Sequence, residues 1–248
     1  MDTPIVLITG ALSGIGRATA LAFAEERARI VVSGRHDEAR QKLVAELRAL
    51  DAEAEFIRAD VRHEDDVRNL VDQTVARFGQ LDVAVNSAGT EGKPGPVTEQ
   101  SAESYAATFD TNVLGTLLSM KHELRVMRAK KHGSIINVSS TFGQLGGAGA
   151  SLYAASKHAV VGLTQSAALE AAEFGVRVNV VAPGPIDTGM LDRFTGTAEK
   201  KAGLVAGVPL KRAGRPEEIA QMIVFLASDK ASFSTGATFA ADGGKTAR

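Results

Sequence analysis

The sequence predicts an α/β fold in which a doubly wound, mostly parallel seven-stranded sheet carries helices on both faces. Two observations support this prediction. Short apolar runs alternate with longer amphipathic segments along the chain, an order that is typical of parallel sheets with crossover helices. A glycine-rich turn also follows the first apolar run directly, at the position where doubly wound folds bind their ligands. We expect the crossover connections to be right-handed.

Apolar runs bounded by glycine, proline or polar residues predict the strands. They span Ile5–Thr9, Arg29–Ser33, Glu55–Ala59, Leu81–Val85, Ser134–Val138, Val176–Val181 and Thr238–Ala240. Segments with apolar residues at helical spacing predict the helices. These span Gly16–Glu26, Asp37–Leu50, Asp65–Phe78, Ser101–Ala129, Ser151–Phe174 and Glu217–Ala227.

The segment Asp187–Pro209 contains four glycines and is the weakest region for regular structure. We expect a mobile lid there, at about residues 187–209, and the alternative is an ordinary surface loop. No internal repeat, low-complexity run or linker divides the chain. We therefore expect one domain over residues 1–248.

Composition limits the classes of function. A net charge of -1 makes nucleic acid and anionic membranes poor candidates as partners. The chain contains no cysteine, which excludes disulfides and thiolate nucleophiles. We expect no membrane span and no signal peptide, and hence a cytoplasmic protein. The five histidines show no i,i+4 pairing, so we expect them at the surface and expect no metal site.

The turn Thr9–Gly16 joins the first strand to the first helix. Glycines let a backbone turn tightly and approach a pyrophosphate, which the helix N-terminus attracts. The spacing G-x-x-x-G-x-G differs from the general dinucleotide fingerprint, and the alternative is a plain strand-to-helix turn. The residues expected to contact a dinucleotide here are Gly10, Leu12, Ser13, Gly14, Ile15 and Gly16.

The end of the second strand bears on the choice between NADP and NAD. No acidic residue follows this strand to accept a hydrogen bond from a ribose 2′-hydroxyl. Arg35, with His36 beside it, would instead contact a 2′-phosphate through its planar guanidinium. This favours NADP, with NAD as the other option, and the alternative for Arg35 is a solvated side chain.

Three further features suggest acid–base chemistry. Tyr153 and Lys157 stand four apart on a predicted helix and so share one face. A nearby cation lowers a phenol pKa of ~10 by ~1–3 units, which would make Tyr153 a proton donor or acceptor. Ser140 follows the fifth strand and would face the ligand crevice. Asn112 is a poor helix former within a predicted helix, so it has a buried role or is a satisfied core residue.

In this order, the motifs resemble those of the short-chain dehydrogenase/reductase family over nearly the whole chain. The matching segments are Thr9–Gly16, Asp60–Val61, Asn86–Gly89, Asn112, Ser140, Tyr153–Lys157, Pro183–Gly184 and Asp242–Gly244. The resemblance implies a Rossmann-type fold and hydride transfer between a nicotinamide cofactor and a small carbonyl or secondary alcohol.

The resemblance also implies roles for individual residues. Tyr153 would be the general acid in reduction and the base in oxidation. Lys157 would lower the Tyr153 pKa and hold the nicotinamide ribose, and Ser140 would hydrogen-bond the carbonyl oxygen. Asn112 would hold a water in a proton relay. The remaining cofactor contacts implied are Asp60, Val61, Asn86, Ala88, Gly89, Pro183, Gly184, Ile186 and Thr188.

The substrate is expected to meet apolar side chains besides Ser140 and Tyr153. Phe142, Met190 and Leu191 are the expected contacts, with Phe194 and Leu204 completing the apolar ceiling and Leu145, Gly146 and Gly147 the floor. One departure concerns the cofactor. Leu12 and Ser13 replace the serine and the basic residue that NADP-preferring relatives often carry, so the expectation of NADP depends on Arg35.

Two other functions stay open. The chain could reduce 3-oxoacyl thioesters on a carrier protein, which needs a basic docking patch. Arg125, Arg128, Lys130 and Lys131 are candidates for it, although a solvated helix end explains them equally well. A cofactor-binding regulator without catalysis would tend to lack the Tyr or the Lys. The resemblance further implies a homotetramer in which the helices Ser101–Ala129 and Ser151–Phe174 pack between subunits.

Overall fold

The computed structural model describes residues 3–35 and 38–247 of the chain. Within them, one sheet has the strand order β3-β2-β1-β4-β5-β6-β7, and every neighbouring pair is parallel. The strands are β1 (Ile5–Thr9), β2 (Arg29–Gly34), β3 (Ala54–Arg58), β4 (Val83–Asn86), β5 (Gly133–Val138), β6 (Val176–Pro183) and β7 (Thr238–Ala241). This topology confirms the doubly wound α/β prediction. The strand order reverses between β1 and β4, which places a ligand crevice above their carboxyl ends.

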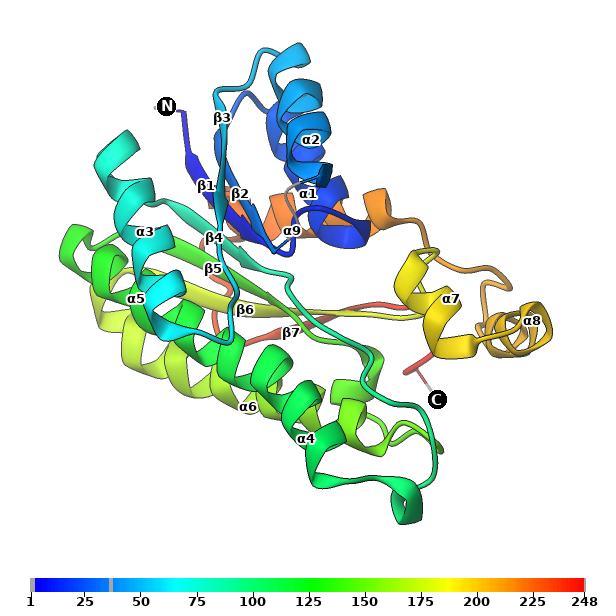
Figure 1. Ribbon diagram of the computed structural model, residues 1–248. Coiled ribbons are helices and arrows are strands. Elements are labelled where there is room, and N and C mark those ends of the chain that lie inside the picture. Colours follow the sequence, from blue (N-terminus) through cyan, green and yellow to red (C-terminus); the bar gives the residue numbers. More distant parts are fainter. Residues whose placement is uncertain (1–2, 36–37, 248) are drawn as a thin grey trace.

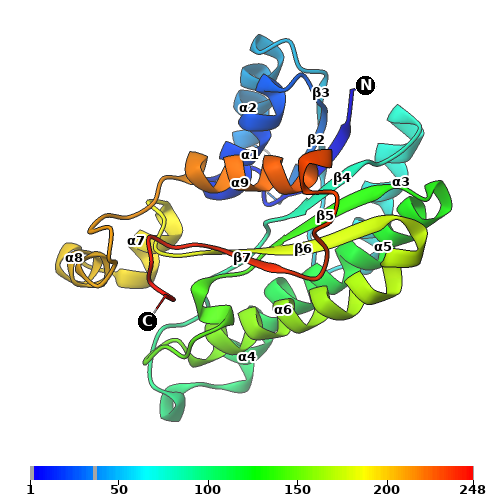
Figure 2. The same ribbon diagram turned by 180° about the vertical axis from the view of Figure 1, so that it is seen from behind.

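Helices cover both faces of the sheet (Figure 1; Figure 2 from behind). One face carries α1 (Gly14–Glu25), α2 (Glu38–Ala49) and α9 (Pro216–Ala227), and the other carries α3 (Glu64–Phe78), α5 (Gly115–Lys130) and α6 (Ser151–Ala171). Successive side chains of a strand point to opposite faces. In β1, Val6 and Ile8 therefore join the core under α1 and α9, whereas Leu7 joins the core under α3, α5 and α6.

The expected helix Ser101–Ala129 is present as one helical run from Ala102 to Lys130, and its only departure from the prediction is a local change of hydrogen-bond pattern. The run consists of α4 (Ala102–Phe109), a π-helical turn (Asp110–Leu114) and α5. The wider π turn contains Asn112, whose side chain is buried and hydrogen-bonded to Thr90 and Ser156. Such bulges occur frequently where a helix presents a functional side chain. Helical periodicity alone does not reveal one.

The segment expected to lack regular structure contains two helices, α7 (Gly189–Thr195) and α8 (Ala198–Ala206). Thr188 and Thr197 start them, because each hydroxyl accepts a hydrogen bond from a backbone N–H in the first turn. Both helices lie beyond the carboxyl end of β6, next to the C-terminal tail (Figure 1). The segment thus stands over the sheet edge where the crevice opens.

Candidate active site

Two adjoining cavities lie above the carboxyl ends of the strands. The main cavity extends from the turn after β1 to α7 and contains Tyr153 and Lys157 on its wall. The side cavity is bounded by the residues that follow β2 and β3, including Arg35 and Asp60. Both cavities are lined by Gly10, Ser13, Ala88 and Gly89. Together they form an elongated cleft that crosses the glycine-rich turn, as an extended dinucleotide requires.

The glycine-rich turn fits close against the loop that follows β4. Gly10 has φ +66°, and a Cβ atom there would lie 2.7 Å from the Cα atom of Ala88. Gly14 has φ +52° and begins α1. At the N-cap of α1, the Ser13 side chain makes no capping hydrogen bond. The N–H groups of the first helical turn therefore face a cradle that suits a pyrophosphate.

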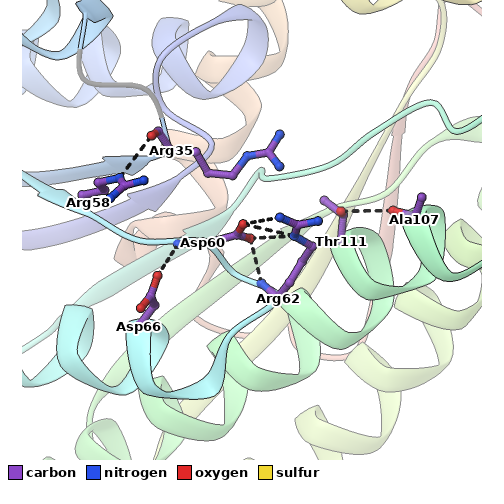
Figure 3. Close-up of polar contacts among 7 residues, drawn as sticks. All are labelled: Arg35, Arg58, Asp60, Arg62, Asp66, Ala107 and Thr111. Carbon is purple, nitrogen blue, oxygen red and sulfur yellow. Dashed lines mark hydrogen bonds and ion pairs between the residues drawn. The ribbon is translucent and has the colours of Figure 1, made fainter.

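Arg35 lines the side cavity, and Arg58 and Arg62 lie close to it (Figure 3). The Asp60 carboxylate is paired with Arg62, whose Nη2 atom lies 2.6 Å from Oδ2. The hydrogen bond from Arg62 lowers the Asp60 pKa to about 2. Arg35 extends its guanidinium over the same space, and its carbonyl accepts a hydrogen bond from Nε of Arg58 at 3.3 Å. This end of the cleft is thus suited to an anionic group. His36 lies outside the described residues.

Tyr153, Ser140 and Lys157 meet on one wall of the main cavity. The Ser140 hydroxyl accepts a hydrogen bond from the backbone N–H of Phe142 at 3.1 Å, and a further hydrogen bond links it to Tyr153. The Lys157 Nζ atom lies 5.7 Å from the centroid of the Tyr153 ring and donates to the carbonyl of Val138 at 2.9 Å. The end of β5 and one face of α6 thereby place a phenol, a hydroxyl and an amine together.

The expected direction of the Tyr153 pKa shift was wrong for this structure. Burial raises the Tyr153 pKa to about 12, and the hydrogen bond with Ser140 only partly opposes this effect. Burial also lowers the Lys157 pKa to about 8. Desolvation disfavours both charged forms, and it prevails because the ammonium is directed at the Val138 carbonyl rather than at the phenol oxygen.

Asn112 lies behind this wall and does not line either cavity. Its Oδ1 atom accepts from the N–H of Thr90 at 2.8 Å, and its Nδ2 atom donates to the carbonyl of Thr90 and to Oγ of Ser156, both at 2.9 Å. Ser156 in turn donates to the carbonyl of Tyr153 at 2.7 Å. Asn112 thus ties the loop after β4 to the turn of α6 that holds the tyrosine. Its expected role with a water stays a prediction.

Most residues expected at the site line the cleft. The main cavity contains Gly10, Ser13, Gly14, Ile15, Ala88, Gly89, Ser140, Phe142, Tyr153, Lys157, Pro183, Gly184, Ile186, Thr188, Met190 and Leu191, and the side cavity adds Leu12, Arg35, Asp60 and Val61. Gly16 does not line it but packs against the carbonyl of Gly10. Asn86 is also set back, because its amide donates to Glu123 and Asn137, both at 3.0 Å, beneath the sheet.

Aromatic rings enclose the tyrosine. The ring centroids of Phe142 and Phe194 each lie 6.1–6.4 Å from that of Tyr153, and Leu204 lines the cavity as expected. Of the expected floor, Phe142 lines the cavity, whereas Gly146, Gly147 and the 37% exposed Leu145 do not. The wall around the phenol is therefore apolar on the side away from the glycine turn.

Three charged residues line the main cavity although no sequence pattern indicated them: Glu91, Arg193 and Lys245. Glu91 and Arg193 form an ion pair although they are 102 positions apart, a separation that carries no periodic signal. His122 was also misjudged as a surface residue. It is only 5% exposed, between α3 and α5, and its Nε2 atom lies 3.3 Å from Oε1 of Glu64.

Comparisons with known proteins agree with this geometry. A family model described as enoyl-(acyl carrier protein) reductase matches residues 10–246. A cis-4-hydroxycyclohexanecarboxylate dehydrogenase from Sinomonas cyclohexanicum is 42% identical, covering 98% of this chain and 96% of its own. A cyclohexanol dehydrogenase from Acinetobacter sp. (strain SE19) is 40% identical, covering 100% and 96%. A 3-oxoacyl-[acyl-carrier-protein] reductase from Thermotoga maritima is 37% identical, covering 98% of each chain.

Solved structures with either nicotinamide cofactor share the fold. The NADP-bound protein ElxO superposes with a TM-score of 0.93 at 34% identity, covering 99% of this chain and 100% of its own. An NAD+-bound xylitol dehydrogenase also gives 0.93, at 33% identity, covering 97% and 98%. Among the described residues, no helix is long and apolar enough to span a membrane, and no cluster of three acidic or histidine side chains is placed to hold a metal ion.

Proposed function

Because the chain belongs to the short-chain dehydrogenase/reductase family, whose members are nicotinamide-dependent oxidoreductases, we propose that it interconverts a small cyclic secondary alcohol and its ketone, with NADP preferred. The observation that carries this proposal is the convergence of Tyr153, Ser140 and Lys157 on one wall of the main cavity, inside an apolar enclosure. The bound nicotinamide supplies or accepts the hydride.

Tyr153 is the proposed acid–base group. With its pKa raised to about 12, the phenol is protonated at neutral pH and ready to donate its proton to a carbonyl oxygen during reduction. Ser140 accepts from the N–H of Phe142 and is hydrogen-bonded to Tyr153. A carbonyl oxygen placed between the two side chains would take over the hydroxyl hydrogen of Ser140 as it gains negative charge. Both groups are fixed at the ends of regular elements, so little reorganisation is needed.

Lys157 and Asn112 support this pair. Lys157 is only 5% exposed, with its Nζ atom held by the Val138 carbonyl. Nζ is also close to Gly89 in the loop after β4, since a Cβ atom added to this glycine would lie 3.5 Å from it. The ammonium is therefore beside the loop that the nicotinamide ribose is proposed to contact. Asn112 fixes the loop and α6 relative to each other. We propose that the relay of protons to solvent starts at Lys157.

The preference for NADP follows from the side cavity. Arg35 presents a guanidinium there, whereas the nearby carboxylate of Asp60 is already neutralised by Arg62. A 2′-phosphate would thus meet a cation, and a 2′-hydroxyl would find no free carboxylate at this position. Comparing kcat/KM for NADPH and NADH with the same ketone tests this, and equal values for the two cofactors would contradict it.

The cyclic substrate is inferred from the enclosure and from the relatives. Phe142 and Phe194 lie at an angle to each other, with centroids 6.1 Å apart, and together with the Tyr153 ring they line the main cavity. This apolar lining suits a small hydrocarbon ring. Two of the relatives are named for cyclohexane alcohols. A panel of cyclic and acyclic alcohols of equal carbon number should show higher kcat/KM for the cyclic members.

The 3-oxoacyl reductase function is the second candidate, since a relative of this name is 37% identical. The basic residues proposed for carrier docking do not favour it. Arg125 is paired with Asp72, and Arg128 stacks on the Phe174 ring at 4.0 Å. They lie on the last turns of α5, which lead into the start of β5, at the opposite end of the sheet from the cavity. An acetoacetyl thioester assayed beside cyclohexanone would separate the two functions.

The decisive experiment for the enzymatic function replaces Tyr153 by Phe. Turnover should fall by at least about 10³-fold because the acid–base group is lost. Binding of NADPH, followed by its fluorescence, should persist because the ring remains. A matched control is Tyr105→Phe, which changes the second tyrosine of the chain, half exposed on α4. Near-normal turnover of the Tyr153→Phe enzyme would refute the role of Tyr153. A wild-type chain that binds NADPH but turns over no member of a broad carbonyl and alcohol panel would instead be a non-catalytic cofactor-binding regulator.

We further propose that the chain forms a single cytoplasmic domain, with residues 187–209 as its lid, and assembles as a homotetramer. Apolar side chains exposed on the helices favour association: Leu117 on α5 is 44% exposed, Leu169 on α6 is 83% exposed, and Phe225 on α9 is 48% exposed. Light scattering coupled to size-exclusion chromatography measures the mass, and a monomer peak would contradict the assembly.

A further inference from the structure

An ion pair bridges the main cavity from one side to the other. Glu91 lies on the loop after β4, and Arg193 lies on α7 of the lid segment. The Nε and Nη2 atoms of Arg193 donate to the two carboxylate oxygens of Glu91 at 2.6 and 3.2 Å. The Glu91 side chain is only 11% exposed, whereas that of Arg193 is 63% exposed. The carboxylate is thus the sheltered partner, and the cation reaches it from the surface.

Arg193 and the next residue connect α7 to the catalytic wall. Phe194 packs against the Tyr153 ring, with centroids 6.4 Å apart, while Arg193 holds Glu91. A movement of α7 away from the cavity would therefore remove two things together: the ring that keeps water from Tyr153 and the cation that neutralises Glu91. The position of this helix determines both the burial of the phenol and the charge near it.

The charged groups that face Tyr153 come from four elements. Lys157 lies on the same helix, Glu91 on the loop after β4, and Arg193 on α7. Lys245 in the C-terminal tail lies 4.8 Å from the centroid of the Phe142 ring, which itself packs against Tyr153. Among the described residues that line the main cavity, Glu91 is the only acid. Its charge raises the pKa of Tyr153, after the larger effect of burial.

We propose that Arg193 switches the electrostatic effect of Glu91 on Tyr153: while α7 holds the ion pair, the Glu91 charge opposes loss of the Tyr153 proton less than it does when Arg193 is withdrawn. The inference rests on the proposed role of Tyr153. Glu91 and Arg193 act through Tyr153 and are therefore positioning residues. Through this pair, α7 affects alcohol oxidation, which needs the phenolate as base, and the ion pair offsets part of the burial that Phe194 adds. Reduction, which needs the neutral phenol, is much less sensitive to the pair.

The first test measures kcat for alcohol oxidation against pH at saturating cofactor and alcohol. Because the Tyr153 pKa is about 12, kcat for oxidation should rise with pH throughout the assay range. Arg193→Gln leaves the Glu91 charge uncompensated and should lower kcat about tenfold at each pH, as a rise of about one unit in the Tyr153 pKa would do. Glu91→Gln removes the charge and should raise kcat or leave it unchanged, and the double variant should match Glu91→Gln to within about twofold. A pair that only fastens the lid would instead lower kcat in both single variants without separating their profiles.

A second test reads Tyr153 without turnover. The chain has two tyrosines and no tryptophan, so Tyr105→Phe makes Tyr153 the only phenol. Titrating tyrosinate absorbance in this background should place the pKa of Tyr153 higher with Arg193→Gln than with Glu91→Gln, while circular dichroism monitors the fold. This readout stays valid if Tyr153→Phe proves active, so the two proposals fail separately.

The matched control for both tests is Arg212→Gln. Arg212 makes an equally two-pronged ion pair with Glu218, at 2.7 and 2.6 Å, but neither residue lines the main cavity. It should shift neither the pH profile nor the tyrosinate titration. Equal profiles for Arg193→Gln, Glu91→Gln and this control would overturn the inference.

Discussion

Replacing Glu123 by Gln should stabilise the protein at alkaline pH and have little effect at acidic pH. Glu123 lies on α5 beneath the sheet, 1% exposed, and its Oε2 atom accepts a hydrogen bond from Nδ2 of Asn86 at 3.0 Å. Its Oε1 atom and Oδ1 of Asn86 have no partner in the described structure. Burial raises the Glu123 pKa from 4.5 to about 7. A carboxylate at this position is thus costly.

The sign and size of the stabilisation expected for Glu123→Gln follow from the linkage between protonation and folding. A carboxyl whose pKa is higher in the folded state binds its proton more tightly there, so ionisation destabilises the fold. The penalty is absent below the unfolded pKa of 4.5, grows as the pH rises toward 7, and is complete above it. With ~1.4 kcal/mol for each pH unit between the two values, it reaches about 3 kcal/mol. Gln keeps the shape and adds an N–H donor but carries no charge.

The assay is urea unfolding followed by circular dichroism at pH 5 and pH 8, at one protein concentration so that association does not alter the comparison. The Gln variant should gain about 3 kcal/mol over wild type at pH 8 and much less at pH 5. Glu173→Gln changes an exposed carboxyl and serves as the control. A difference between Glu123→Gln and wild type that is the same at both pH values would refute the reasoning.

Three further predictions concern the cleft. Arg35→Ala should lower kcat/KM for NADPH about tenfold and leave kcat/KM for NADH unchanged, because a charge-assisted contact with the 2′-phosphate is lost. The control is Arg68→Ala, which removes an exposed ion pair on α3. An equal loss of kcat/KM for both cofactors would contradict the assignment of Arg35. Gly10→Ala should abolish binding of either cofactor in a fluorescence titration. The added Cβ atom would lie 2.7 Å from the backbone of Ala88, and the alanine would have to adopt a φ of +66°. Since burial raises the Tyr153 pKa to about 12, the rate of oxidation should rise through the alkaline range while reduction is fastest below it; a pH-independent oxidation rate from pH 7 to 10 would show that the phenol is not the base.

The fold was predictable from the sequence because its signals are local. Strands such as Ile5–Thr9 are continuous apolar runs, and the turn after it has glycines where the backbone needs positive φ. Helix starts within the lid were missed, although Thr188 and Thr197 carry the capping hydroxyls. There the glycines were taken as evidence against helices, whereas Gly196 in fact ends one of them in the left-handed conformation.

Sequence alone predicted which residues meet in the cleft where a fixed spacing on one helix brings them together, as with Tyr153 and Lys157. The site was not predictable where a contact joins distant segments. The pairing of Glu91 with Arg193 depends on how α7 lies over the loop after β4. The inward position of Asn86 depends on Glu123 lying beneath it. Neither arrangement follows from hydrophobic period or motif, since both arise from packing between elements.

Burial shifts the pKa values of Tyr153 and Lys157 in opposite directions, and both shifts favour the neutral form of the side chain. It raises the pKa of Tyr153 to about 12 and lowers that of Lys157 to about 8, so both are held closer to their neutral forms than in water. If Tyr153 is the acid–base group as proposed, the buried phenol is already in the protonated form that reduction needs, whereas oxidation must first overcome the same desolvation. The chain can ease that step by arranging charge: by keeping Lys157 protonated and by neutralising Glu91. On the proposed mechanism, the pH dependence of oxidation and reduction is thus a property of the electrostatics around one hydroxyl, and α7 carries one of the charges that set it.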